Sequence, residues 1–532
     1  MQPVPPYIIY LAGALLAPFF NGKIKSLFII LTMVAAFVNV LLIQPQKSLV
    51  YTFSNFEIIL FNADRTSLFI GYIFALMAVL ITVYSIQVKE NIYHIFSFLY
   101  IGSAMGVVFA GDFVSFYLFG EIMLITAVVL ICYNKDKTAV KAGFRYLLIH
   151  LFGGSLLLAG ILLNYTATGT MDIASLQGGL PAMLILAGIG VNAAFIPFHT
   201  WLPDAYSKAS FTASLLLSVF TTKSAVYALA RIFPGVEVVA YMGAAMAIFG
   251  VIFALLQSDA RKLLSYHVIS QVGFMMAGVG MGTFLGIDGA LYHAWNNILY
   301  KSLLFMCIGA VIYRTGKQDL SELGGFAWKM PVTTIACIIA SLSISGVPLF
   351  SGYASKAILY EATYGSNLLY WMLKLASLGT FLSFSKFTYF GFLRLKNVEV
   401  REAPLNMTIP MIFVALLCII GGIYPRLTID ILPYYIDTPL YIPSKVVDAL
   451  VFTVLSGIIF FLGMKKIFNP HKKEIADIDS IYIKLVKKVF AGNRKKGLHW
   501  AMALDLNTLG LSIFLTVFTL VLFLLFLFIG KL

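Results

Sequence analysis

Apolar runs long enough to cross a lipid bilayer recur along almost the whole chain, and they constrain its fold more than any other feature. A membrane-spanning helix needs about 20 mostly apolar residues at a rise of roughly 1.5 Å per residue. Turn and charge signals separate sixteen such runs, near 7–20, 27–43, 66–88, 92–110, 113–132, 144–165, 181–200, 210–232, 239–257, 263–281, 286–313, 331–350, 355–394, 407–425, 448–468 and 510–530. The sequence therefore predicts an all-α polytopic membrane protein with about 16 transmembrane helices.

The composition and the placement of charge agree with this prediction. Charged residues make up 11% of the chain and its mean hydropathy is +0.93, whereas soluble domains have about 25% charged residues. With the N-terminus outside, 25 of the 37 Lys and Arg residues fall in inside loops and six in outside loops. Such a bias is typical of cytoplasmic loops. The net charge of +14 therefore follows membrane topology and does not indicate nucleic-acid binding.

The same bias predicts a multi-pass protein of the cell (plasma) membrane with both termini outside. The first twenty residues carry no basic n-region and no small-residue cleavage pattern, which favours a retained first helix over a removed signal peptide.

Four cysteines are scattered singly through the predicted spans: Cys132, Cys307, Cys337 and Cys418. This spacing predicts no metal site, no iron–sulfur cluster and no cofactor in this chain.

Several charged side chains lie inside the predicted spans. A charge at the bilayer centre costs about 2.5–3.5 kcal/mol on insertion scales, and such residues mark ion or proton pathways. The main candidates share this position: Glu121, Lys223, Lys301 and Lys356. Weaker candidates are the ionisable residues His267, His293 and Lys386. Packing histidines and lysines that snorkel to an interface are the alternative interpretation.

Gly and Pro placement indicates two interruptions of helices inside the membrane. One follows Asn192 and contains Pro197 and Pro203, and the other extends from Gly346 to Lys356. Irregular backbone at membrane depth is tolerated where it lines a wet cavity. Both interruptions are therefore candidate parts of a pathway.

Five motifs resemble those of the antiporter-like subunit family. This family comprises the large subunits of Mrp-type Na+/H+ antiporters, of membrane-bound hydrogenases and of respiratory complex I. The resemblance extends over roughly residues 60–430, and the motifs are GDFVSFYLFGE (Gly111–Glu121), PFHTWLPDA (Pro197–Ala205), SDARKLLSY (Ser258–Tyr266), HAWNNILYK (His293–Lys301) and GVPLFSGYASK (Gly346–Lys356).

The resemblance implies two inverted five-helix repeats with broken helices, and a polar axis of charged residues along the membrane midplane. The implied domains are N-terminal helices at 1–90, a first repeat at 91–260, a second at 261–430, and C-terminal helices at 431–532. A basic segment at 469–509 shows a short amphipathic pattern. It is interpreted either as a shortened strap between neighbouring subunits or as a basic loop on anionic lipid.

Two positions depart from the family pattern. Asn192 stands where the family has the lysine that pairs with the residue matching Glu121, and Asn297 stands where it often has a second histidine. An asparagine can form hydrogen bonds but cannot take up a proton. Three consequences stay open for the N-terminal half: it conducts poorly, it uses another cation, or it borrows a charge from a neighbouring subunit.

The predicted function is that of a proton-translocating or Na+/H+ antiport subunit of a multisubunit membrane complex, without a catalytic redox site of its own. Its expected partners are antiporter-like subunits, small Mrp-like subunits and possible redox-module subunits, with protons and possible Na+ as transported ions. Two alternatives are a degenerate scaffold subunit without a complete proton path, which the two asparagines favour, and an autonomous cation transporter.

Overall fold

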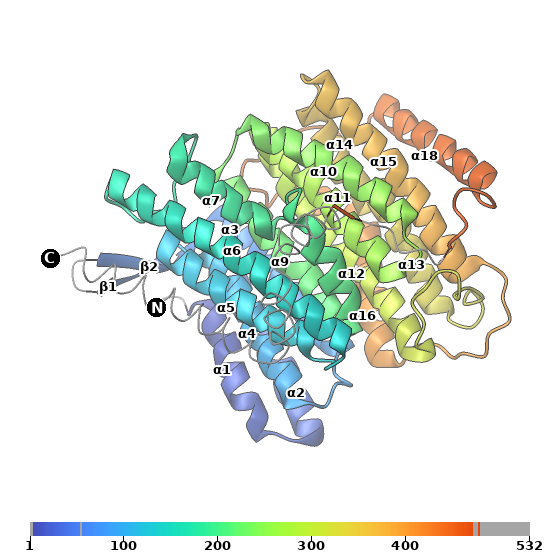
Figure 1. The fold of residues 1–532 in the computed structure, drawn as a ribbon, viewed down its shortest axis with the longest axis horizontal. Helices are drawn as coiled ribbons and strands as arrows, with labels where there is room; N and C mark the ends of the chain where they lie inside the picture. The colour runs from blue at the N-terminus through green and yellow to red at the C-terminus, as the bar shows by residue number, and fades with distance from the viewer. Residues whose placement is uncertain (1–3, 54–55, 472–476, 479–532) are drawn as a thin grey trace, which may run out of the picture.

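A computed structural model describes residues 4–53, 56–471 and 477–478. Its helices pack side by side in one bundle, with α18 along the edge next to α15 (Figure 1). The elements are α1 (Pro6–Leu16), η1 (Ala17–Phe19), α2 (Gly22–Leu42), β1 (Lys47–Phe53), β2 (Phe56–Ala63), α3 (Arg65–Tyr84), α4 (Asn91–Phe109), α5 (Phe113–Cys132), α6 (Lys137–Thr168), α7 (Gly179–Asn192), η2 (Phe198–Thr200), α8 (Trp201–Lys208), α9 (Phe211–Ile232), α10 (Glu237–Leu256), α11 (Ala260–Gly280), α12 (Phe284–Thr315), α13 (Pro331–Ser345), α14 (Ser351–Ala362), α15 (Asn367–Thr388), η3 (Tyr389–Leu393), α16 (Leu405–Ile423), α17 (Arg426–Ile429) and α18 (Pro443–Gly463).

Twelve helices of the described residues are long and apolar enough to cross a membrane, and three shorter apolar helices accompany them. The protein is therefore an integral multi-pass membrane protein. The span predicted at 181–200 contains most of α7 and the break before α8. The span predicted at 355–394 contains the end of α14 and the whole of α15. The sixteenth predicted span, 510–530, and most of the 469–509 segment lie outside the described residues.

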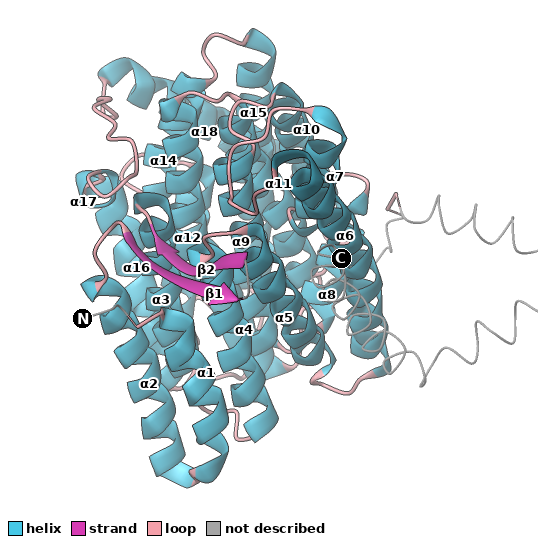
Figure 2. Cartoon of the chain, turned by 90° about the vertical axis from the view of Figure 1, so that its left-hand side faces the viewer, coloured by secondary structure: helices cyan, strands magenta, loops and turns pink. Residues whose placement is uncertain are grey.

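The all-α prediction is incomplete because residues 47–63 include an antiparallel hairpin. β1 pairs with β2, with a register shift between Leu49 and Val50. Tyr51 and Ile58 are among its paired residues, and β-branched and aromatic side chains favour strands. β2 contacts α3, α4 and α5, and Figure 2 shows the hairpin in magenta against the bundle. The hairpin lies in a segment that sequence analysis treated only as a loop between spans.

Aspartate N-caps begin four of the central helices. The side chains of Asp64, Asp112, Asp136 and Asp259 accept hydrogen bonds from backbone N–H groups in the first turns of α3, α5, α6 and α11. Each such cap stabilises a helix by about 0.5–2 kcal/mol. Residues next to each helix therefore determine where it starts, and the start of a helix determines the positions of the charged residues further along it.

Hydrogen bonds join the connecting loops into two groups. One group, called here the hairpin face, is joined by the backbone hydrogen bonds Gly111 N to Ile59 O (3.0 Å), Phe113 N to Met171 O (2.8 Å), Leu176 N to Ile232 O (2.7 Å) and Gly235 N to Val279 O (3.0 Å). The other group, called the basic face, is joined by Ala260 N to Gln318 O (2.9 Å), Leu320 N to Ser258 O (2.9 Å), Gly325 N to Arg394 O (2.8 Å) and the guanidinium of Arg261 to Ala209 O (2.6 Å). Successive helices thus run between two faces.

Corresponding features recur at a constant separation in the two halves of the bundle. Isolated antiparallel bridges join Asp112 to Asp172 and Asp259 to Asp319, and the second bridge follows the first by 147 positions. Both α6 and α12 contain 32 residues and end at a left-handed glycine, Gly169 or Gly316, with the same separation. Since α5 starts at the hairpin face and α11 at the basic face, the matching helices run in opposite directions.

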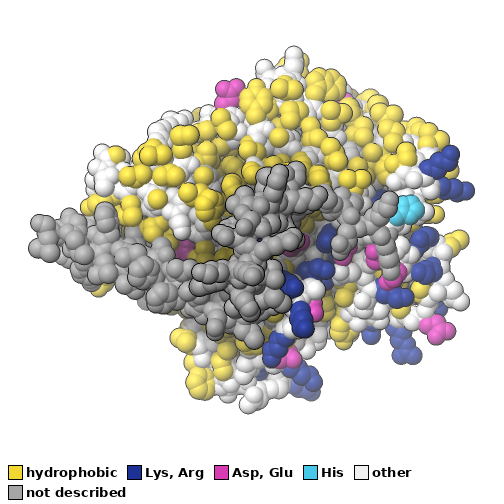
Figure 3. All heavy atoms as spheres, in the orientation of Figure 1, with side chains coloured by type: hydrophobic (Ala, Val, Ile, Leu, Met, Phe, Trp, Pro, Cys, Tyr) yellow, Lys and Arg dark blue, Asp and Glu magenta, His cyan; other side chains and the backbone are white. Residues whose placement is uncertain are grey.

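The surface of the bundle is largely apolar in the view of Figure 3, where Lys and Arg gather towards the lower right. Exposed hydrophobic side chains occur on many of the outer helices, and only 11% of the residues in the apolar stretch of α18 are buried. By contrast, all residues in the apolar stretches of α9 and α11 are buried. These two helices therefore form the centre of the molecule and carry ionisable residues away from lipid.

Candidate functional site

Both helix interruptions predicted from the sequence exist. α7 ends at Asn192, and five non-helical residues precede η2. α13 ends at Ser345, and Gly346 continues the chain with φ of +78°. A broken helix leaves carbonyl groups without their usual N–H donors. The indole of Trp201 donates to the Val191 carbonyl at 3.1 Å, so a side chain beyond the first break satisfies one of these groups.

The Lys356 ammonium occupies the second break. Its Nζ donates to the carbonyl of Ile344 at 2.9 Å and lies 5.2 Å from the ring centroid of Phe274. The side chain also packs against Gly346, where an added Cβ would come within 3.0 Å of the Lys356 Cδ. A cation is favourable at a helix C-terminus, where unpaired carbonyls carry partial negative charge. The break in α13 therefore provides a binding place for this lysine.

The Glu121 side chain on α5 faces a cavity of about 40 Å³. His150 from α6, Asn192 from α7, and Thr221 and Ser224 from α9 also line it. A water molecule needs roughly 10–15 Å³ of such space and two to four polar partners. The cavity is therefore large and polar enough for a small number of water molecules, and it places Glu121 and Asn192 in the same site.

Within this cavity the glutamate is only partly satisfied. Tyr117 forms a hydrogen bond with the Glu121 carboxyl group, while Oε2 of Glu121 and Nε2 of His150 have no partner among the described residues. The other ring nitrogen of His150 lies 2.8 Å from the Tyr146 carbonyl oxygen. Gly154 leaves room for the carboxylate, because a Cβ there would lie 2.5 Å from Glu121 Oε1.

Lys223 lies at the centre of α9 and is completely buried. Its Nζ donates to the Ser218 carbonyl at 2.9 Å and to Oγ1 of Thr222 at 3.3 Å. Thr221 and Ser224, which line the Glu121 cavity, are its close neighbours in the sequence. The first-half cavity therefore reaches the helical turn that carries this lysine.

A hydrogen-bonded network surrounds His293 in the second half. One ring nitrogen lies 2.9 Å from Ser355 Oγ, and the other lies 3.1 Å from Gln271 Oε1. Gln271 also accepts from the Tyr300 hydroxyl at 3.2 Å, and Asn297 Nδ2 donates to that hydroxyl at 3.3 Å. Asn297 is thus connected to His293 through Tyr300, even though it cannot itself carry a proton.

Lys301 and His267 lie near the same aromatic ring. The Phe384 centroid is 5.6 Å from Lys301 Nζ and 4.6 Å from the centroid of the His267 ring. Both residues are completely buried. In the described part of the chain, neither ring nitrogen of His267 nor the Lys301 ammonium has a hydrogen-bond partner.

The ionisable groups of the bundle centre lie within electrostatic reach of one another. Lys223 acts on both Lys301 and His293, and Lys356 acts on both His267 and His293. Each of these interactions repels a second positive charge. A proton bound by one member therefore makes protonation of its neighbours less favourable.

Lys386 has a different environment. Its Nζ donates to the carbonyls of Leu255 at 2.6 Å and Gln257 at 2.8 Å, at the C-terminal end of α10 near the basic face. A cation at this position satisfies carbonyls that the helix leaves free. The described contacts join Lys386 to the end of α10 and not to the central residues.

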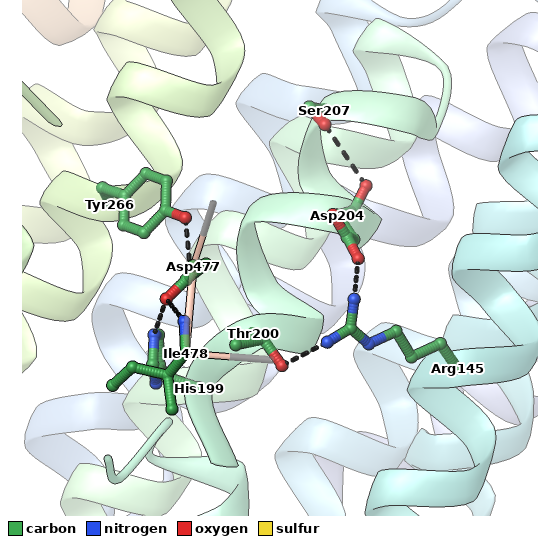
Figure 4. Close-up of polar contacts among 8 residues, drawn as sticks. All are labelled: Arg145, His199, Thr200, Asp204, Ser207, Tyr266, Asp477 and Ile478. Atoms are coloured by element: carbon green, nitrogen blue, oxygen red, sulfur yellow. Dashed lines mark hydrogen bonds and ion pairs between the residues drawn. The ribbon is translucent and has the colours of Figure 1, made fainter. Parts of the chain in front are cut away.

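Figure 4 shows a polar cluster that sequence analysis did not identify as a site. Asp477, which follows α18 in the chain, lies with Oδ1 3.3 Å from Nε2 of His199 and accepts from the Tyr266 hydroxyl at 2.5 Å. Burial opposes ionisation of this carboxyl group, but the hydrogen bonds with His199 and Tyr266 outweigh it and hold the pKa of Asp477 below its usual range. Only the folded chain brings these residues together, since they lie in three separate segments.

An arginine on α6 joins the same region. Arg145 forms an ion pair with Asp204 on α8 and donates to Oγ1 of Thr200 at 2.6 Å (Figure 4).

Two residues of the His293 network, Gln271 and Ser355, were also missed by sequence analysis. A glutamine in an apolar span was a usable signal for Gln271, whereas a buried serine carries no comparable signal.

The described residues contain no cluster of three or more His, Cys, Asp or Glu side chains that could hold a metal ion. All four cysteines are free, and three of them are buried. Lys, His and amide side chains supply the ionisable and hydrogen-bonding groups described above for the bundle centre.

Residues 110–383 match the family described as NADH:quinone oxidoreductase/Mrp antiporter, transmembrane. The chain belongs to this family. It is 30% identical over 471 residues to an uncharacterized protein of Methanocaldococcus jannaschii, with 81% of this chain and 97% of that protein covered. It is 29% identical over 485 residues to a Na(+)/H(+) antiporter subunit of Alkalihalophilus pseudofirmus, covering 76% of this chain and 59% of that protein.

The fold is also similar to a solved structure of the membrane-bound sulfane sulfur reductase, an archaeal respiratory membrane complex. The TM-score is 0.75 at 24% identity, covering 97% of this chain and 99% of the compared chain. The protein is thus an antiporter-like subunit of the Mrp and complex I family, and the sequence-based family prediction is confirmed. It spans little more than half the length of the Alkalihalophilus protein.

Proposed function

We propose that this subunit translocates protons, alone or in exchange for Na+, along the row of residues from Lys223 through Lys301, His267 and His293 to Lys356. The observation that carries the proposal is their arrangement: they are buried, belong to helices far apart in the sequence, and lie in electrostatic contact. Ionisable residues that face the interior of a membrane protein are costly and mark ion or proton routes.

Unpaired polar atoms support a hydrated route. Buried polar groups normally have a partner, and water supplies it where protein does not. The orphaned atoms among the described residues include the Lys301 ammonium, both His267 nitrogens and the amide nitrogen of Gln271. Water bound to these groups would connect donors that are not in direct contact.

The constant separation of matching features supports an arrangement in two repeats. We infer that α4–α9 and α10–α15 are inverted five-helix repeats, each with one broken helix, α7/α8 and α13/α14. Inverted repeats place binding groups near their common interface, where broken helices meet. This assigns the central lysines to the midplane between the repeats. The domain limits expected from the family resemblance are 1–90, 91–260, 261–430 and 431–532. Because α10 (Glu237–Leu256) belongs to the second repeat in this arrangement, we propose that the boundary between the repeats lies before α10 and not at residue 260.

The first half is proposed to contribute a modified site. Glu121 faces Asn192 and His150 across one cavity, without a described cation as its partner. A hydrated carboxylate of this kind binds a proton or a small cation. The site would therefore exchange ions with Lys223, whose neighbours line the same cavity.

The second candidate function is a scaffold subunit that has kept the fold and lost translocation. Asn192 and Asn297 favour it, because each is a non-titratable residue in a site with titratable neighbours. The other central residues are buried and act on one another electrostatically, and this favours translocation. An autonomous cation transporter is disfavoured by membership of a family that includes subunits of multisubunit antiporters.

The deciding experiment measures ion flux in vesicles containing the assembled complex with Lys223→Ala or Lys356→Ala. A positioned proton-transfer group contributes about 10²–10⁴-fold to a rate, so we expect a loss of at least about 10²-fold. Lys329→Ala is the matched control, since this exposed loop lysine lies outside the bundle centre. Normal assembly with undiminished flux in both variants would favour the scaffold.

The proposed partners are other membrane subunits of the same complex, and the proposed location is the plasma membrane with the basic face cytoplasmic. Lys and Arg accumulate in cytoplasmic loops. Identification of the co-purifying subunits tests the first assignment, and protease access to the loops of each face in sealed vesicles tests the second.

A further inference from the structure

A second and much larger cavity opens between α14, α15 and α18. Its volume is about 460 Å³, and its wall includes Ser345, Lys356, Lys374 and Asp448. Lys356 belongs to the central row, whereas Asp448 lies on α18, beyond the residues 110–383 that match the family. The cavity therefore joins the end of the proposed route to a helix that the family match does not include.

Exposure increases along the charged groups of this cavity. Lys356 is 2% exposed, while the side chains of Lys374 and Asp448 are 7% and 43% exposed. Lys374 and Asp448 form an ion pair. These three charged groups therefore lie in order from the bundle centre to the surface: Lys356 is buried, Lys374 is nearly buried and Asp448 is half exposed.

Aromatic rings hold Lys374 in this position. Its Nζ lies 4.4 Å from the Tyr360 centroid, 5.0 Å from the Phe452 centroid and 5.5 Å from the Tyr370 centroid. Such rings stabilise a cation, most strongly where it is desolvated. Lys374 also acts electrostatically on Lys356. Positive charges on the two lysines repel each other.

The cavity lies towards the hairpin-face end of these helices. Lys445 on α18 forms an ion pair of 2.6 Å with Glu361 on α14, and both line the cavity. Glu361 lies at the end of α14, just before the turn that leads to α15. α18 runs along the outer edge of the bundle next to α15 (Figure 1). Ion pairs to α14 and α15 therefore hold a peripheral helix over the opening.

We propose that this cavity is a hydrated vestibule through which protons pass between Lys356 and the hairpin-face solution, with Asp448 as the terminal carboxylate. The inference rests on the proposed function of the central row. In the outward step, the Lys356 ammonium gives its proton to vestibule water, and the proton is passed to the Asp448 carboxylate. The carboxyl group then gives it to the solution and returns to its ion pair with Lys374, so charge and protons balance.

The hydration of the vestibule is tested by cysteine labelling in the full complex, in a variant whose four native cysteines are replaced. Ser345→Cys places a thiol on the cavity wall, and Ser343→Cys, two residues earlier on α13, is the matched control, because Ser343 is completely buried and does not line the cavity. A charged, membrane-impermeant thiol reagent should modify the first variant and not the second. Modification of the first by a lipid-soluble reagent alone would indicate a lipid-filled groove and overturn the proposal.

The role of Asp448 is tested by Asp448→Asn, which keeps the shape of the side chain. We expect ion flux to fall by on the order of 10²-fold, while labelling of the Ser345→Cys thiol persists. Asp437→Asn is the matched control, because Asp437 forms an exposed ion pair with Arg426 outside the cavity. If Asp448→Asn retains full flux while Lys223→Ala abolishes it, the vestibule is wrong and the central route stands. Full flux in both variants would instead reject the proposed function.

Discussion

Gly154→Ala offers a test of the Glu121 site that changes no charge. An added Cβ would lie 2.5 Å from Glu121 Oε1, and ordinary contacts begin at 3.4 Å, so the carboxylate oxygen must move by about 0.9 Å. The displaced atom is the end of a flexible side chain beside a cavity of about 40 Å³. Helix propensity also favours alanine over glycine by about 1 kcal/mol. We therefore expect the protein to fold and assemble with its stability within roughly 1 kcal/mol of the wild type.

The effect on transport should be much larger than the effect on stability. A misplacement of about 1 Å in a reacting group can reduce a rate about 10²-fold, and the movement changes the distance from Glu121 to Tyr117. Ion flux in vesicles, divided by the amount of assembled complex, is the measurement. Gly457→Ala on α18 is the control, since the nearest atom to its added Cβ is 4.0 Å away, on Phe381.

A double variant makes this test more specific. Glu121→Asp withdraws the carboxylate by about one carbon–carbon bond, roughly 1.5 Å, which is more than the space that the new methyl group requires. Because this withdrawal displaces the carboxylate by more than the roughly 0.9 Å required in Gly154→Ala, Glu121→Asp should itself reduce flux, and adding Gly154→Ala in that background should reduce it no further. Wild-type flux in Gly154→Ala alone, at normal assembly, would refute the argument that the position of this carboxylate matters.

Two further predictions concern Asn192 and Asp477. Asn192→Lys places an ammonium in the cavity of Glu121, where opposite charges about 4 Å apart attract by roughly 4 kcal/mol. Flux should rise, and an unchanged rate would show that the missing lysine does not limit the first half. Asp477→Asn weakens charge-assisted hydrogen bonds with His199 and Tyr266, at a cost of about 1.5–3 kcal/mol. Because the folded pKa of Asp477 is lowered, this stability is present above the unfolded value of about 3.9 and is lost as the pH falls through the folded pKa. Hydrogen exchange of α8 should therefore accelerate in the variant at neutral pH and equal that of the wild type in acid.

Much of the fold follows from local properties of the sequence. Runs of apolar residues determine which segments can be helices in lipid, because a helix alone satisfies its backbone groups there. The breaks after Asn192 and Ser345 were also predictable, because Pro and Gly lie close together there. A single proline does not always end a helix, since Pro410 lies inside α16. The hairpin was missed because its strands are stabilised by each other and by α3–α5, and hydropathy does not report such pairing.

For the site, the sequence by itself determined which charges enter the bundle: Lys223, Lys301 and Lys356 lie in apolar runs, and all three are buried. It ranked Lys386 below them, but only the structure shows where this lysine lies: it donates to carbonyls at the end of α10.

The tertiary structure alone decided which groups meet. Glu121 shares a small cavity with His150, Lys374 pairs with Asp448, and Asp477 reaches His199. The physical reason is that hydropathy and helix-breaking act over a few neighbouring residues. Contacts between helices depend on how complete side-chain surfaces pack, and the partners in such contacts are separated by tens to hundreds of positions.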